Sequence, residues 1–219
     1  MSTNGGEART IPDDRTNARL EAFCDGVFAI ALTLLILDIK VPDPHGISSS
    51  ADLWHALRDL LPSFLAFVLS FIIVLITWVN HHGAAQLVRG TSASFLYANG
   101  LLLLTVVFLP FPTALLGAYI GSDYPAPAVI LYDAVVAFQA IAWFLLGNTA
   151  LRNHLECSAE AVDVLRKHRL QAVQAFGLYG ALAALAVWFP RAAAIITAAT
   201  WVFWLFVGVR LKAPVEVRG

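Results

Sequence analysis

The chain has 219 residues, of which 59% are apolar and only 13% are charged, and its mean hydropathy is +0.73. Soluble domains carry about a quarter charged residues, so this composition predicts an all-α integral membrane protein. The net charge of −1 provides no basic surface for nucleic acid, and we expect no nucleic-acid partner. The two cysteines, Cys24 and Cys157, are not expected to form a disulfide.

The chain begins with a polar stretch, residues 1–18, which lacks the apolar core of a signal peptide and is interpreted as a flexible cytoplasmic tail. The first predicted span follows at residues 19–42. Its twelve uncharged residues between Asp25 and Asp38 make about 18 Å of helix, whereas the hydrocarbon core is about 30 Å thick. At least one of these carboxylates therefore lies at membrane depth, where it should face protein or water instead of lipid.

Helical angles divide this first span into two faces. At about 100° per residue, Ile30, Thr33, Leu34 and Leu37 fall in one stripe, and Asp25 falls almost opposite. Asp25 is therefore predicted to point into its own subunit or towards a neighbouring helix. The stripe by itself leaves two interpretations open, because ordinary packing or lipid contact would give the same spacing as a pore lining.

Charge-free runs predict five further spans, at residues 60–80, 95–117, 127–151, 170–190 and 192–209. Together with the first, they form a predicted six-helix domain over residues 19–211, followed by a cytoplasmic tail at 212–219. Eleven of the 14 Lys and Arg residues fall on the side of the amino terminus and three on the other. This asymmetry places both termini in the cytoplasm and predicts a multi-pass protein of the cell inner membrane.

Several polar residues are predicted to meet at the cytoplasmic end of the first three spans. His81 and His82 end the second span and Asn99 lies near the start of the third, at the level of Asp25. We interpret them as a structural hydrogen-bond network, with a proton or ion site as the alternative. Adjacent histidines point in different directions on a helix, so a metal site is not favoured. Nucleophile, base and orienting acid are not found together, so the protein is not expected to be an enzyme.

The first span, "RLEAFCDGVFAIALTLLILDIKVP", resembles the first helix of the transmembrane protein 175 family, the lysosomal potassium channel and its bacterial relatives. The family motif R-x-x-x-F-S-D reads Arg19, Phe23, Cys24 and Asp25 here. The resemblance continues in "WVNHH" at residues 78–82 and "LLLLTVVFLPFPTALLG" at residues 101–117. Cys24 departs from the motif serine, and its weaker hydrogen bonding predicts a looser network.

The resemblance implies a potassium-permeable cation channel, built as a homotetramer around the first helix of each six-helix subunit. It implies that Ile30, Leu34 and Leu37 form a hydrophobic constriction and that Thr33 tunes a modest preference for potassium over sodium. It also implies a structural polar network, with these candidates: Arg19, Phe23, Cys24, Asp25, Trp78, His81, His82 and Asn99. No cofactor is expected apart from the permeant potassium ion, and the expected partners are further copies of the chain, membrane lipids and monovalent cations.

One further site role and two alternative functions stay open. Asp38, with nearby acidic residues, is predicted to make an outer vestibule that concentrates cations, although simple solvation of these loop acids is an alternative. The main alternative function is a proton- or cation-coupled transporter that uses Asp25 and the histidines. A non-conducting membrane scaffold is the other.

Overall fold

The computed structural model describes the backbone of residues 13–210 and the side chains of residues 17–205. The regular elements of this part of the chain are all helices, which confirms the predicted all-α class. The predicted tail at 212–219 lies outside the described residues, and so do residues 1–12 of the predicted tail at 1–18.

Helix α1 spans Asp13–Leu34 and continues as a 3-10 turn, η1, over Leu35–Asp38. It thus begins inside the stretch expected to be a tail, and residues 13–18 are helical.

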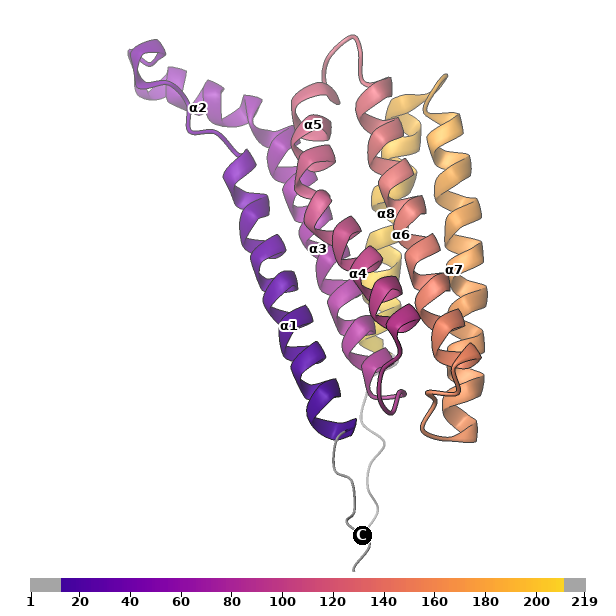
Figure 1. Ribbon diagram of the computed structural model, residues 1–219. Coiled ribbons are helices and arrows are strands. Elements are labelled where there is room, and N and C mark those ends of the chain that lie inside the picture. Colours follow the sequence, from indigo (N-terminus) through magenta and orange to yellow (C-terminus); the bar gives the residue numbers. More distant parts are fainter. Residues whose placement is uncertain (1–12, 211–219) are drawn as a thin grey trace, which may run out of the picture.

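The loop after α1 contains structure that was not predicted. A 3-10 turn, η2, covers Pro44–Gly46, and helix α2 covers Ser50–Asp59. The Ser49 hydroxyl caps α2 by accepting a hydrogen bond of 3.2 Å from the backbone N–H of Asp52. In Figure 1, α2 projects away from the bundle beyond the upper end of α1.

The second span is helix α3, Leu61–Ala85, which runs past its predicted end at residue 80 and includes both histidines. The third is divided into α4, Ala93–Phe108, and α5, Pro110–Tyr119. Pro110 causes this break, because it lacks the N–H group of the helical ladder and its ring crowds the preceding turn. The predicted span at 95–117 is confirmed as part of the apolar segment Ala93–Tyr119, but the expectation of a single unbroken helix is wrong at Leu109.

The remaining helices are α6, Ala126–Arg152, α7, Ala159–Leu185, and α8, Pro190–Arg210. Helix α7 begins eleven residues before its predicted span, because charged residues continue the helix beyond its apolar part. Among the described residues, four helical segments are long and apolar enough to cross a membrane: Asn17–Asp38, Leu61–Ala85, Ala93–Tyr119 and Ala126–Arg152. Helices α7 and α8 complete the bundle beside them (Figure 1).

Helix α1 stands at the edge of the bundle, against α3 and α4 (Figure 1). The buried face of α1 and η1 consists of Cys24, Phe28, Ala31 and Leu35, which are at most 1% exposed. Their spacing of three and four residues is that of one side of a helix. The stripe predicted from helical angles lies on the other, uncovered side of α1.

Candidate functional site

The uncovered stripe of α1 is the first part of the candidate site. Ile30, Leu34 and Leu37 are 59%, 38% and 63% exposed, and Thr33 is exposed beside them. The Thr33 hydroxyl donates a hydrogen bond of 2.8 Å to the backbone oxygen of Ile30. We call these four residues the open face of α1, with Leu37 included although it lies in η1, the continuation of the helix. In a membrane, such a face meets lipid or another copy of the chain.

On the inner side of α1, Asp25 is held by α3. The indole nitrogen Nε1 of Trp78 donates a hydrogen bond of 2.8 Å to Oδ1 of Asp25. The carboxylate is half-buried and points away from the open face, as the helical angles predicted.

A second set of bonds joins α1, α3 and α4. His81 Nε2 lies 2.7 Å from Asn99 Oδ1, and Asn99 Nδ2 donates to Cys24 Sγ over 3.1 Å. An amide oxygen can only accept, so Nε2 of His81 carries the proton. Cys24, which replaces the motif serine, therefore takes part in the network as an acceptor.

His82 bonds to Glu21, which is not among the predicted members of the network. Its Nδ1 lies 2.7 Å from Oε1 of Glu21, and its Nε2 lies 3.0 Å from Nε2 of Gln86. Glu21 and Asp25 carry like charges one helical turn apart, so each carboxylate needs its own hydrogen-bond donor. This spacing could have identified Glu21 as a member of the network from the sequence. The structure supplies two donors: Trp78 for Asp25 and His82 for Glu21.

Two predicted members stand apart from this network. Arg19 is exposed and makes no hydrogen bond or ion pair with the described residues, and Phe23 is 62% exposed. Their helical angles place both on the side of the open face, at the other end of α1 from Leu37. The structure of one chain thus brings together Cys24, Asp25, Trp78, His81, His82 and Asn99, but not Arg19 or Phe23.

Asp38 lies in η1, at the opposite end of α1 from the polar network (Figure 1). It is half-buried, and its Oδ2 atom has no hydrogen-bond partner among the described residues. Lys40 nearby donates a bond of 3.1 Å to the backbone oxygen of Leu37. The vestibule role of Asp38 stays a prediction.

A second buried polar cluster was missed. Asp133 of α6 is fully buried, and its Oδ1 accepts a bond of 2.7 Å from the hydroxyl of Thr197 on α8. Next to it, Ser70 lies 2.9 Å from the hydroxyl of Tyr132 and 2.6 Å from that of Thr113. The sequence feature that could have revealed this cluster is Asp133 itself. A single carboxylate inside an apolar helix is rare and indicates that the residue has a specific partner.

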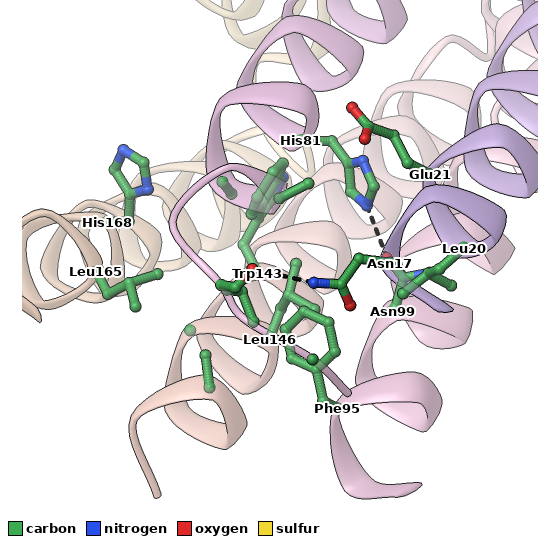
Figure 2. A pocket seen from close by; sticks show the side chains of 16 residues that line it. Asn17, Leu20, Glu21, His81, Phe95, Asn99, Trp143, Leu146, Leu165 and His168 are labelled. Atoms are coloured by element: carbon green, nitrogen blue, oxygen red, sulfur yellow. Dashed lines mark hydrogen bonds between the residues drawn. The ribbon is translucent and has the colours of Figure 1, made fainter. Parts of the chain in front are cut away.

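A cavity of about 50 Å³ adjoins the network where α1 begins. In Figure 2, His81 lies between Glu21 and Asn99, and both Trp143 and His168 lie to the left of them. The His81 Nδ1 atom is buried and has no hydrogen-bond partner among the described residues.

Comparison with known proteins gives consistent matches. The sequence model of the endosomal/lysosomal potassium channel TMEM175 family matches residues 19–110. A protein of Chamaesiphon minutus named a potassium channel is 49% identical over 131 residues, which are 60% of this chain and 63% of that one. Another from Streptomyces collinus is 44% identical over 135 residues, which are 59% of this chain and 64% of that one. These matches span less than two thirds of either relative.

A solved structure extends the likeness to most of the chain. It is the crystal structure of a lysosomal potassium-selective channel TMEM175 homologue from Chamaesiphon minutus. The two chains are 37% identical and superpose with a TM-score of 0.73, which covers 87% of this chain and 98% of the other.

Proposed function

Because the chain belongs to the family of the endosomal/lysosomal potassium channel TMEM175, which is a channel and not an enzyme, we propose that it forms a potassium-permeable cation channel. The observation that carries this proposal is the open face of α1. This helix buries one side against α3 and α4 and leaves Ile30, Leu34 and Leu37 uncovered at the edge of the bundle (Figure 1). An apolar face at the edge can line a pore only if further copies of the chain complete the wall.

The proposed assembly is a homotetramer in the cell inner membrane, with six spans per subunit and both termini in the cytoplasm. Four copies of the open face surround the axis, so Ile30, Leu34 and Leu37 form stacked aliphatic rings. A narrow ring of this kind blocks ions by excluding water, and it conducts when the rings widen or rotate.

Thr33 is the polar exception on this face. Its hydroxyl proton is used in the bond of 2.8 Å to the Ile30 carbonyl, which leaves the oxygen lone pairs able to face a passing cation. Aliphatic rings alone discriminate poorly between ions, so we propose a modest preference for potassium over sodium, to which Thr33 contributes. Asp38, at the outer end of α1, adds negative charge to the vestibule and raises the local cation concentration.

The polar network on the inner side of α1 is consistent with this function, because it holds the helix in place. The Trp78–Asp25, His81–Asn99–Cys24 and His82–Glu21 contacts all hold α1 against the bundle at one level. They fix the rotation of α1, and the rotation of α1 decides which residues meet the pore axis.

Purified protein in planar bilayers, recorded under a potassium/sodium gradient, tests the proposal. We expect unitary currents whose reversal potential lies towards the potassium equilibrium potential. Coupled, saturable cation uptake into liposomes without unitary currents would instead favour the transporter alternative with Asp25 and the histidines. The absence of both would leave a non-conducting scaffold.

A further inference from the structure

An open groove lies at the end of the bundle opposite the polar network, between two connections of the chain. One connection joins α5 to α6 and the other joins α7 to α8, and both lie at the upper end of the bundle in Figure 1. The groove has a volume of about 390 Å³ and is lined by Asp123, Pro125 and residues 189–192. This volume is within the range of small-molecule sites, about 300–1,000 Å³.

The groove contains a cation that is held in place but not neutralised. Nη2 of Arg191 donates a hydrogen bond of 2.9 Å to the backbone oxygen of Ser122, and its Nε donates a longer one of 3.5 Å to that of Ile120. A guanidinium has five N–H donors, so the two Nη1 protons and one Nη2 proton stay available to a ligand. Arg191 is exposed and forms no ion pair with the described residues. An anionic group that enters the groove can therefore bond to it.

Asp123 brings a negative charge to the same groove. It is exposed, and its carboxylate makes no hydrogen bond or ion pair with any residue that the structure describes. Two opposite charges that line one groove without contacting each other leave space between them for a molecule that carries both charges. Asp123 would repel a purely anionic ligand, and Arg191 would repel a purely cationic one.

The groove lies at the depth of lipid headgroups. The apolar segment Ala93–Tyr119 ends just before the connection from α5 to α6, and Ala126–Arg152 begins just after it. This connection therefore lies where membrane-spanning helices meet water. Tyr124 and Phe189 are exposed here, and tyrosine is favoured at this boundary. The zwitterionic molecules that surround a protein at this depth are phospholipids.

We propose that this groove binds the headgroup of a phospholipid that carries a primary ammonium group, the phosphatidylethanolamine class. The lipid phosphate accepts hydrogen bonds from Arg191, the ammonium donates to Asp123, and the glycerol backbone lies against Phe189. A choline headgroup has no N–H donor and a glycerol headgroup has no positive charge, so both suit Asp123 less well. The proposal requires only that the helices span a membrane, and it does not depend on channel activity.

Native mass spectrometry of the full chain tests this site. The protein is purified in detergent and titrated separately with dioleoyl phosphatidylethanolamine, phosphatidylcholine and phosphatidylglycerol, which share their acyl chains. We expect the ethanolamine lipid to bind one site per chain at least about fivefold more tightly than the other two. Equal binding of the three lipids, or tightest binding of the glycerol lipid, overturns the proposal.

A soluble ligand distinguishes a lipid from a free headgroup. Glycerophosphoethanolamine carries the same charges without acyl chains, and we expect it to bind much more weakly than the lipid, because it gains nothing from contact with the apolar surface of the bundle. Equal affinity for the two would show that the groove takes a free headgroup, which overturns the lipid assignment.

Two substitutions locate the headgroup. Asp123→Asn keeps the size of the side chain and removes its charge, so the preference for ethanolamine over choline lipid should fall below about twofold. Arg191→Gln removes the phosphate donor, and we expect it to weaken the binding of all three lipids about tenfold. Asp59→Asn and Arg58→Gln, at exposed positions of α2 at the same end of the bundle, are the matched controls and should bind like the unmodified protein. An unchanged preference in Asp123→Asn, or the same loss in Asp59→Asn, would place the lipid elsewhere and overturn the proposal, whether or not Arg191→Gln folds well.

Discussion

Trp78 and Asp25 make one of the side-chain contacts that hold α1 on α3, a hydrogen bond of 2.8 Å. Trp78→Phe keeps a ring in place and removes only the donor, which leaves the carboxylate without this partner. We expect the free energy of unfolding to fall by about 1–2 kcal/mol, measured by reversible denaturation in mixed micelles.

Trp188→Phe is the control for this substitution. Trp188 is 72% exposed, so its loss should change the free energy of unfolding by less than about 0.5 kcal/mol. If both variants lose the same free energy, the Asp25 bond does not stabilise the bundle.

Thr197 is the hydrogen-bond partner of the buried carboxyl of Asp133, over 2.7 Å. Thr197→Val has nearly the same shape but leaves Oδ1 of Asp133 unpaired. The expected loss in the free energy of unfolding is about 1–2 kcal/mol, in the same denaturation assay. Thr200→Val, one turn nearer the end of α8, removes a hydroxyl whose bond among the described residues is to the backbone oxygen of Ile196, and it should have a much smaller effect. A larger loss in Thr200→Val than in Thr197→Val would show that the Asp133 pair is not what holds α6 to α8.

Residue-level prediction succeeded where helical geometry decides the outcome. Asp25 and Ile30 face opposite ways because a helix turns by about 100° per residue, and the structure confirms that arrangement. It failed for Asp133, because counting charge-free residues treats any carboxylate as the end of a span. Such a count cannot recognise a carboxyl whose partner, Thr197, comes from a helix 64 residues later in the chain.

At the scale of elements, Gly117 sets how closely α5 approaches α3. A Cβ atom at this position would lie 2.8 Å from the backbone Cα of Ser63, which cannot move without shifting α3. We therefore expect Gly117→Ala to lower the free energy of unfolding by about 1–3 kcal/mol through overpacking.

Gly100→Ala on α4 is the matched control. A Cβ there meets nothing within 4 Å, so the better helix propensity of alanine should raise the free energy of unfolding by up to about 1 kcal/mol. Equal changes in the two variants would mean that α5 and α3 can separate at no cost.

Element boundaries were harder to predict than element positions. Helix α7 begins at Ala159 because Ser158 caps it and charged residues continue it beyond the apolar stretch. Helix α2 was missed because ten residues are too few for a search based on the length of a span. In both cases local capping by serine, and not hydropathy, determined where the helix begins.

At the scale of the whole molecule, the proposed channel function depends on the position of α1. The helix is bound on one side by a polar network and is uncovered on the other, at the edge of the bundle (Figure 1). The resemblance of the sequence to a channel family could predict this helix as pore-lining. The spacing of its apolar residues alone could not, because a lipid-facing helix has the same pattern.

The most direct measurement is therefore the unitary current of Ile30→Asn beside Ile195→Asn, in planar bilayers under a potassium/sodium gradient. The two isoleucines are 59% and 68% exposed on different helices, and each variant places the same amide on an uncovered apolar face. If Ile30 lines the constriction, Ile30→Asn gives a severalfold larger current and a reversal potential shifted towards that of sodium, while Ile195→Asn behaves like the unmodified protein. Unchanged currents in Ile30→Asn, or the same change in both variants, would contradict a pore built around α1.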